Sequence, residues 1–311
     1  MPLPIDPKKI KDVADEVIED LANEININVY VDTSASPKMI ESLTSFLKVD
    51  DSKVHIKFID LDTKSLGLAY EPDFSIIIAG DDKYSALCYK ALQIKGIPAL
   101  IVGLDPNPVL FAAKTEAVEI LRDDLICPAY NTYTFKAGDA GKKAIDFSDY
   151  NKKMDKSLKN KIVDWMYIYS EVVQISYALH FPFLRPAISR RIINACSIEN
   201  AGLSMLKVLP GIDMPLCIAN QVKMILELAA IYGYDISLDR IVEIIVVILS
   251  NFGMRELSEL VKDEVSVPKF LVDGVFGFAG TELLGFAARE YFSRGLAPDG
   301  LIEKCKSLFK K

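Results

Sequence analysis

Residues 209–233 read LPGIDMPLCIANQVKMILELAAIYG, and the C-terminal half of the chain can be organised around this segment. A Pro-Gly pair interrupts whatever structure precedes it, and Asp213 then stands at the position of a helix N-cap. From Met214 to Tyr232 nearly every residue is apolar, and Gly233 provides a C-terminal stop. A helix that is apolar on almost all sides lies in a protein core or faces a membrane. We therefore expect a helical domain that wraps around this segment.

A thin polar stripe interrupts the apolar surface of this helix. Asn220, Lys223 and Glu227 recur at spacings of three and four, which puts them on one face. Lys223 and Glu227 lie near the middle of the helix, where charged side chains are costly in lipid. The stripe therefore favours a buried helix, with Lys223 and Glu227 as a structural i,i+4 pair rather than as catalytic groups.

Further helices are predicted around this segment, at residues 158–181, 187–208, 238–250, 254–265, 269–293 and 299–309. The helix at 269–293 contains interior glycines, each of which costs about 0.8–1 kcal/mol relative to Ala. A face of small residues offsets this cost when it lets another helix approach closely. We expect residues 213–232 to be that partner. The small face consists of Gly274, Gly277, Thr281, Gly285 and Ala288.

The N-terminal half alternates predicted strands with predicted helices. The strands cover residues 25–31, 54–61, 74–79, 97–102 and 124–128, and the helices cover 6–24, 37–47, 83–95 and 109–122. This alternation predicts a doubly wound, mostly parallel, Rossmann-like α/β sheet. The expected fold class is therefore α/β plus all-α. The expected domains are an α/β domain at 1–130, a linker at 131–157 and a helical bundle at 158–311.

The segment after the first predicted strand lacks the features of a phosphate-binding loop, which reads G-x-x-x-x-G-K-[ST]. Aligning Lys38 with the lysine of that pattern puts Asp32 and Pro37 where the two glycines should stand. Asp32 would direct a carboxylate toward the phosphates, and Pro37 lacks the N–H that should bind them. Met39 stands at the Ser/Thr position and cannot bind magnesium. The chain also lacks an N-K-x-D motif for guanine, so we expect no nucleotide hydrolysis.

The same segment reads DTSAS at residues 32–36, a D-x-S-x-S pattern. It resembles the metal-ion-dependent adhesion site of von Willebrand factor A domains. In those domains the Asp and both Ser side chains hold a magnesium ion, a cation that prefers oxygen ligands. The resemblance implies that Asp32, Ser34 and Ser36 are metal ligands. The alternative is that these three side chains cap the helix that starts near residue 37.

Two further ligands of such a site would come from other loops. Thr63, in the motif DLDT, is a candidate for the first, and Asp81 or Asp82, in AGDDK, is a candidate for the second. Asp81 and Asp82 also suit an ordinary N-cap before the helix at 83–95. The sequence therefore leaves a magnesium site and a pair of helix caps as alternatives.

The overall composition excludes several classes of function. The chain has 36 Lys and Arg against 43 Asp and Glu, a net charge of −7, which argues against nucleic acid as the main partner. Five scattered cysteines without a C-x-x-C motif favour reduced thiols, and two histidines argue against a His-rich zinc site. The first residues, MPLPIDPKKI, lack the apolar stretch of a secretory signal. We expect a cytoplasmic protein.

Four segments resemble the YcjF-type bacterial helical domain of unknown function, over about residues 185–295. They read ISRRIINACSIENAG, LPGIDMPLCIANQVKMILELAAIYG, SNFGMRELSELVK and GFAGTELLGFAAREYFSRG. Domains of this type often follow Era-like GTPase domains and are associated with bacterial membranes, and no catalytic residues are assigned in them. The resemblance implies that the N-terminal half is a degenerate GTPase-like domain.

Together these patterns predict a non-enzymatic bacterial scaffold or recognition protein that uses no cofactor. Its helical domain would self-associate, bind a protein partner or dock at the inner surface of the inner membrane. The alternative is a ligand-binding module that depends on magnesium at the D-x-S-x-S site. An enzyme is disfavoured, because the sequence offers no paired acid and base and no activated nucleophile.

Overall fold

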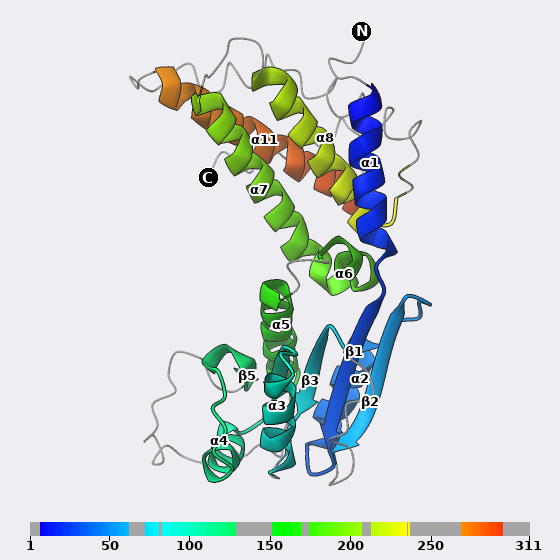
Figure 1. Ribbon diagram of the computed structural model, residues 1–311, viewed down its shortest axis with the longest axis vertical. Helices are drawn as coiled ribbons and strands as arrows, with labels where there is room; N and C mark the ends of the chain where they lie inside the picture. Colours follow the sequence, from blue (N-terminus) through cyan, green and yellow to red (C-terminus); the bar gives the residue numbers. More distant parts are fainter. Residues whose placement is uncertain are drawn as a thin grey trace. The chain divides into compact units, whose positions relative to one another are not determined.

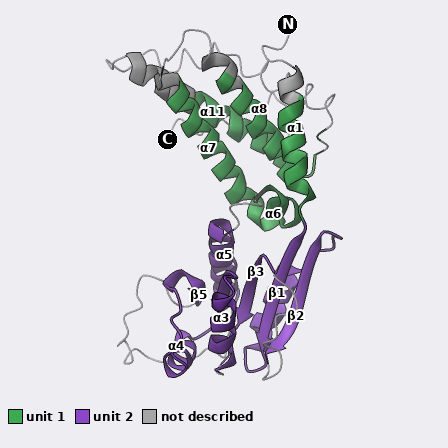
Figure 2. Ribbon diagram, in the orientation of Figure 1, with its two compact units in different colours: residues 1–23, 173–311 green, residues 24–172 purple. Residues whose placement is uncertain are grey.

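The computed structural model describes residues 7–61, 72–80, 83–128, 151–169, 174–206, 213–234, 236 and 269–294. The chain forms two compact units (Figure 2). The α/β unit comprises residues 24–172, and the helical unit comprises residues 1–23 together with 173–311. The predicted combination of a parallel α/β sheet with a helical region is confirmed.

The α/β unit is built on a five-stranded parallel sheet with the order β2-β1-β3-β4-β5 (Figure 1). Every neighbouring pair of strands is parallel. The strands are β1 (Ile25–Asp32), β2 (Val54–Leu61), β3 (Phe74–Ile78), β4 (Ala99–Val102) and β5 (Leu125–Ile126). The order reverses at β1, with β2 on one side and β3 to β5 on the other, so the sheet is doubly wound as predicted.

The helices described in this unit are α2 (Pro37–Leu47), α3 (Tyr84–Ile94), α4 (Pro106–Thr115) and α5 (Lys152–Tyr169). The short 3-10 turn η1 (Arg122–Asp124) precedes β5. All five residues of β3 are buried, as expected for a central parallel strand. The core under α3 contains Tyr30, Ile77, Ile101 and Leu92.

The fourth helix differs from the predicted range of 109–122. It begins at Pro106 because the carboxylate of Asp105 accepts a hydrogen bond from the backbone N–H of Asn107 at 2.9 Å and so caps the helix. It ends at Thr115, shortly before Ala117 takes a left-handed backbone conformation with φ of 50°. The Asp-Pro pair at 105–106 was therefore the true start signal, because Pro is favoured in a first helical turn.

Residues 158–181 form two helices that belong to different units, not the single helix predicted. The first, α5, lies in the α/β unit because its aromatic side chains reach a buried carboxylate. Asp124, which is 4 % exposed, accepts hydrogen bonds from Trp165 Nε1 at 2.9 Å and Tyr169 Oη at 3.1 Å. Tyr89 Oη of α3 donates to the other carboxylate oxygen at 2.6 Å. Asp124 therefore fastens α5 to the sheet domain.

The N-terminal helix α1 (Pro7–Ala22) belongs to the helical unit, although the predicted α/β domain began at residue 1. Its buried side chains Ala14 and Val17 serve the packing of α1 against α8 and α6. The boundaries between units therefore fall after residue 23 and after residue 172, not at 130 and 158. The α/β unit is inserted between α1 and the remainder of the helical unit.

The other described helices of the helical unit are α6 (Gln174–His180), α7 (Arg185–Leu206), α8 (Asp213–Ile231) and α11 (Lys269–Arg294), with the 3-10 turn η3 (Pro182–Leu184) before α7. The apolar helix predicted at 213–232 is confirmed as α8. No helix in the described ranges is both long and hydrophobic enough to cross a bilayer. The helices predicted at 238–250, 254–265 and 299–309, and most of the linker predicted at 131–157, lie outside the described residues.

The small-residue face of α11 packs closely on two helices. A Cβ atom added to Gly285 would lie 2.7 and 2.9 Å from Cγ1 and Cγ2 of Ile193 on α7, and 2.9 Å from Sδ of Met224 on α8. Thr281 and Ala288 on the same face are fully buried. The predicted close approach is therefore confirmed at Gly285, but the partner is α7 as well as α8.

Candidate functional site

The fold points to the carboxyl edge of the sheet between β1 and β3. Ligands of open parallel sheets bind in the crevice where the strand order reverses, and that reversal lies at β1 and β3. The segment 32–36 follows β1 and leads into α2, and residues 79–80 follow β3 and precede α3. Both helix N-termini favour negative charge at this edge.

A buried carboxylate already occupies this edge. Asp32 is 2 % exposed. Its Oδ1 accepts hydrogen bonds from the backbone N–H of Ser34 at 2.9 Å and from the Ser34 hydroxyl at 2.7 Å. The hydroxyl of Ser85, a buried residue in the first turn of α3, lies 3.3 Å from Asp32 Oδ2 and donates to it. Asp32 thus holds the β1–α2 turn to the start of α3.

The structure brings together only part of the predicted ligand set. Asp32 and Ser34 are in contact, whereas Ser36 is the N-cap of α2 and its side chain makes no capping hydrogen bond to the described residues. The predicted cap by the Ser36 hydroxyl is therefore absent among the described residues, and the Asp32 carboxylate instead accepts a hydrogen bond from the backbone N–H of Ser34, before the helix starts. The remaining candidates, Thr63, Asp81 and Asp82, lie outside the described residues.

Gly80 brings the loop after β3 against the loop after β1. A Cβ atom at this position would lie 2.1 Å from Ser34 Oγ and 2.6 Å from the backbone N of Ala35. A side chain of any size is excluded there, because two of the nearest atoms belong to the backbone of the other loop. The two loops are therefore closed on each other at the position where the strand order reverses.

A row of buried polar side chains, which was not predicted from the sequence, continues from Asp32 along β1. Asn28 and Tyr30 lie on the same face as Asp32, because alternate residues of a strand share a face. Both are buried, and Asn28 Nδ2 donates to Tyr30 Oη at 3.4 Å. Ser75 of β3 pairs in register with Asn28, and its buried hydroxyl has no partner among the described residues. The sequence pattern that could have predicted this row is the alternation of Asn28, Tyr30 and Asp32 with apolar residues in ININVYVD, residues 25–32.

The buried thiols give no support to a cysteine nucleophile. Burial raises the pKa of Cys88, Cys127 and Cys196 to about 12 in each case. A nucleophilic cysteine needs the opposite shift, since the thiolate is the reactive form. These three side chains therefore remain protonated at neutral pH and serve the core.

An open hollow of about 510 Å³ lies beside α4. Its apolar wall includes Phe111, which is 74 % exposed. Its polar wall carries both signs of charge, from Lys83, Asp105 and Glu116. This mixture does not select one class of ligand, and the Asp105 carboxylate is already engaged at the N-terminus of α4.

The helical unit has a buried polar centre around Asn200 of α7. Asn200 Nδ2 donates to Thr281 Oγ1 of α11 at 3.0 Å and to the Cys217 carbonyl of α8 at 3.3 Å. Asn220 Nδ2 donates to Asn200 Oδ1 at 3.2 Å, and Gln221 Nε2 donates to Thr281 Oγ1 at 3.1 Å. One fully buried amide therefore fixes the register of three helices.

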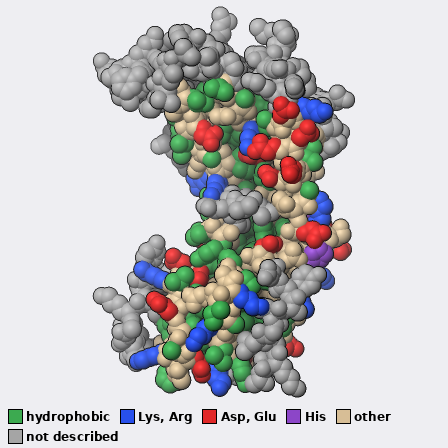
Figure 3. Space-filling model, viewed as in Figure 1, with side chains coloured by type: hydrophobic (Ala, Val, Ile, Leu, Met, Phe, Trp, Pro, Cys, Tyr) green, Lys and Arg blue, Asp and Glu red, His purple; other side chains and the backbone are tan. Residues whose placement is uncertain are grey.

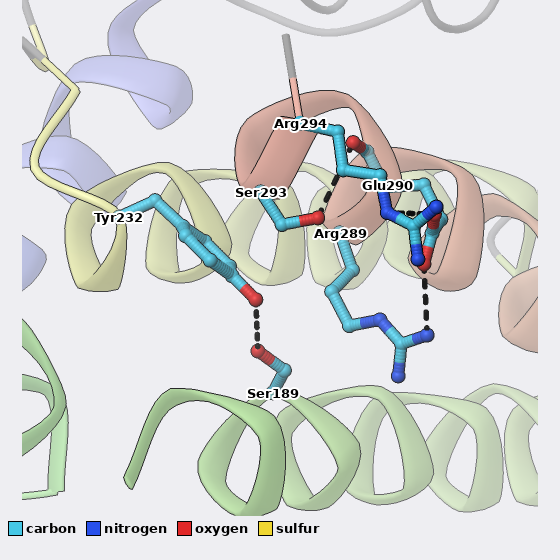
Figure 4. A network of polar contacts seen from close by, with 6 residues as sticks. All are labelled: Ser189, Tyr232, Arg289, Glu290, Ser293 and Arg294. Atoms are coloured by element: carbon cyan, nitrogen blue, oxygen red, sulfur yellow. Dashed lines mark hydrogen bonds and ion pairs between the residues drawn. The ribbon is translucent and has the colours of Figure 1, made fainter. Parts of the chain in front are cut away.

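A second polar group lies near the C-terminal end of α11 (Figure 4). The carboxylate of Glu290, 8 % exposed, lies 3.3 Å from Arg289 Nη2 and 3.0 Å from Arg294 Nε. Nearby, Ser189 Oγ of α7 contacts Tyr232 Oη, just after α8, at 3.5 Å. The ion pairs of Glu290 lie within α11, and the contact between Ser189 and Tyr232 connects α7 to the residues that follow α8.

Lys223 differs from its predicted pairing. Its ammonium forms an ion pair with Glu16 of α1, with an Nζ–Oε1 distance of 2.6 Å, instead of the predicted i,i+4 pair with Glu227. Burial raises the pKa of Glu227 to about 7, although the charge of Lys223 acts in the opposite direction. The polar stripe of α8 therefore contacts α1 at Lys223 and α7 at Asn220.

The chain was compared with known protein families, curated proteins and solved structures. Residues 184–296 match the family model described as Domain of unknown function (DUF697). The matched region contains α7, α8 and α11, together with the Asn200 and Glu290 contacts. No curated protein and no solved structure matches the chain. The C-terminal region is therefore similar to a domain whose function is not assigned.

Proposed function

We propose that the protein is a bacterial, non-enzymatic scaffold or recognition protein, whose α/β unit is a GTPase-like domain without nucleotide chemistry. The observation that carries this proposal is the buried Asp32 carboxylate at the edge where the strand order reverses. The proposal also uses the pattern of the sequence, in which Asp32, Pro37 and Met39 replace the residues of a phosphate-binding loop.

The contacts of Asp32 explain why phosphate would bind poorly. A phosphate-binding loop offers its backbone N–H groups to the ligand. Here the amide of Ser34 donates to Asp32, and the buried negative charge repels a second anion. The close approach of Gly80 to Ser34 further reduces the space at this edge.

The helical unit is proposed to be the assembly module, through self-association, a protein partner or the inner surface of the inner membrane. Large apolar side chains on its surface support this role, since Ile198 of α7 is 64 % exposed and Leu216 of α8 is 42 % exposed. In this proposal the protein is cytoplasmic and peripheral to the membrane, and nucleic acid is not a partner.

Isothermal titration calorimetry of the full chain with GTP and with ATP, each with magnesium, tests the proposal. We expect no saturable heat up to millimolar nucleotide. Micromolar binding of either nucleotide would refute the assignment. The variant Asp32→Asn removes the charge and keeps the shape, so weak phosphate binding by this variant alone would support the repulsion argument.

The second candidate is a magnesium-dependent ligand-binding module built on Asp32, Ser34, Ser36 and Asp81. The contact between Asp32 and Ser34, two oxygen-bearing side chains at the sheet edge, favours it. A calorimetric magnesium titration of the wild type, Asp32→Ala and the control Asp105→Ala tests it. Binding that is lost only in Asp32→Ala supports the module. An absence of binding in all three proteins would rule it out.

A further inference from the structure

The first helix is held in the helical unit by both apolar packing and charge. Among the described side chains of α1, residues 11–22, Ala14 and Val17 are buried, Val13 and Leu21 are half-buried, and Ile18 is 47 % exposed. Two residues separate α1 from β1, and the carbonyl of the first, Asn23, accepts a hydrogen bond from Ser176 Oγ of α6 at 3.2 Å. Because an ion pair joins Glu16 of α1 to Lys223 of α8, charge also influences whether α1 stays on α8.

The charges at this contact are strongly unbalanced. Glu16 and Asp20 of α1 face Glu227 and Lys223 of α8, and Glu199 of α7 acts on the same group. Among the described residues, three carboxyl groups, those of Glu16, Asp20 and Glu227, act on the Lys223 ammonium, which is already paired with Glu16 at 2.6 Å. Figure 3 shows Asp and Glu side chains gathered over α1 and α8.

Glu227 is the member of this cluster that titrates near neutrality. Burial is the largest cause that raises its pKa from 4.5 to about 7, and the carboxylates of α1 and α7 act in the same direction. The pKa of Asp20 is also raised, by burial and by Glu16. Cys196 of α7 interacts with Glu227 as well, and its thiol stays protonated. The charged groups that shift the pKa of Glu227 belong to α1, α7 and α8.

We infer that α1 is a pH-sensitive strap, which is held on α8 while Glu227 is protonated and is loosened when Glu227 ionises. Ionisation adds a negative charge beside Glu16, Asp20 and Glu199, with Lys223 as the cation that acts on Glu227 among the described residues, and solvent cannot fully screen a charge that is partly buried. The sign follows from linkage. A carboxyl whose pKa is raised in the docked state favours docking at low pH, and this advantage is lost as the pH rises through about 7.

Hydrogen–deuterium exchange of the full chain, read by mass spectrometry over peptides from residues 7–22, tests the inference. Protection factors corrected for intrinsic exchange are compared at pH 6 and pH 8. We expect protection of α1 to be lower at pH 8 than at pH 6 by up to about tenfold, which is the limit between these two pH values for a carboxyl whose pKa is 4.5 when α1 is released and about 7 when α1 is docked. Peptides of α3 provide the internal reference, since that helix belongs to the other unit.

Three variants complete the test. Glu227→Gln should keep α1 protected at pH 8 and remove the pH dependence, whereas Glu282→Gln on α11 should behave as the wild type. Lys223→Gln removes the ammonium and should lower α1 protection at both pH values, which keeps the inference testable if Glu227→Gln folds poorly. Equal protection of wild-type α1 at pH 6 and 8, or full pH dependence in Glu227→Gln, would overturn the inference.

Discussion

Replacement of Gly285 by Ala should destabilise the helical unit by about 1–2 kcal/mol. The new methyl group would meet Ile193 carbons at 2.7 and 2.9 Å and Met224 sulfur at 2.9 Å. Overpacking of this kind costs about 1–3 kcal/mol, and the better helix propensity of Ala returns up to about 1 kcal/mol. Because Ile193 is branched and held within α7, the neighbour that must move is a stiff one.

Thermal unfolding of the full chain, followed by the far-UV circular dichroism of its helices, measures this effect. Gly202→Ala is the matched control, because Gly202 lies in α7 with no atom within 4 Å of its added Cβ. We expect Gly285→Ala to lower Tm by about 2–8 °C and Gly202→Ala to raise it. If both variants were stabilised to the same extent, the inference that α11 packs closely on α7 and α8 at Gly285 would be refuted.

Three further substitutions test the fold around the candidate sites. Asp124→Asn weakens the acceptor of three donors, so the free energy of unfolding of the α/β unit should fall by about 2–3 kcal/mol. The denaturant midpoint, followed by Trp165 fluorescence, should fall accordingly, and an unchanged midpoint would contradict the role of this carboxylate. Asn200→Ala leaves buried partners on α8 and α11 unpaired, so the free energy of unfolding of the helical unit should fall by about 2–3 kcal/mol in urea. A loss under about 0.5 kcal/mol would refute the role of this amide. Asp105→Ala should cost about 1 kcal/mol as a lost N-cap, whereas Ser36→Ala should cost almost nothing; equal effects in thermal melts would contradict the assigned caps.

Much of the α/β sheet could be predicted because its signals are local. The helix at 37–47 and the strand at 54–61 were predicted with the bounds that the structure has. Buried parallel strands are continuous apolar runs, and Pro37 marks a helix start. The predicted range of the helix at 106–115 was wrong because the apolar pattern suggested 109–122, whereas the start of the helix is set by the capping Asp105 and the prolines that follow it.

The division of the chain could not be predicted, since it depends on contacts between distant residues. The apolar face of α1 suits a sheet or a helix bundle equally well, and only packing on α8 decides between them. The same holds for α5, whose Trp165 and Tyr169 are aromatic in the sequence but find Asp124 only in the folded unit. An amphipathic pattern predicts a helix and leaves its partner open.

The candidate site was predicted in part for the same reason. DTSAS marked Asp32 and Ser34 because a polar cluster after a strand is a local pattern. The donor Ser85 and the close approach of Gly80 come from another loop and helix, so no spacing in the sequence relates them to Asp32. The buried row of Asn28 and Tyr30 was readable as alternation along a strand.

The insertion of the α/β unit also affects how the chain folds during synthesis. Glu16 and its partner Lys223 are 207 residues apart. At about 5–20 residues per second, the ribosome needs about 10–40 s to make α8 after α1 has been completed. The described strands of the α/β unit end at residue 126, so its sheet can form in that interval. Until α8 emerges, the apolar face of α1 lacks the helix that covers it in the folded protein, and it must wait in the nascent chain without that cover.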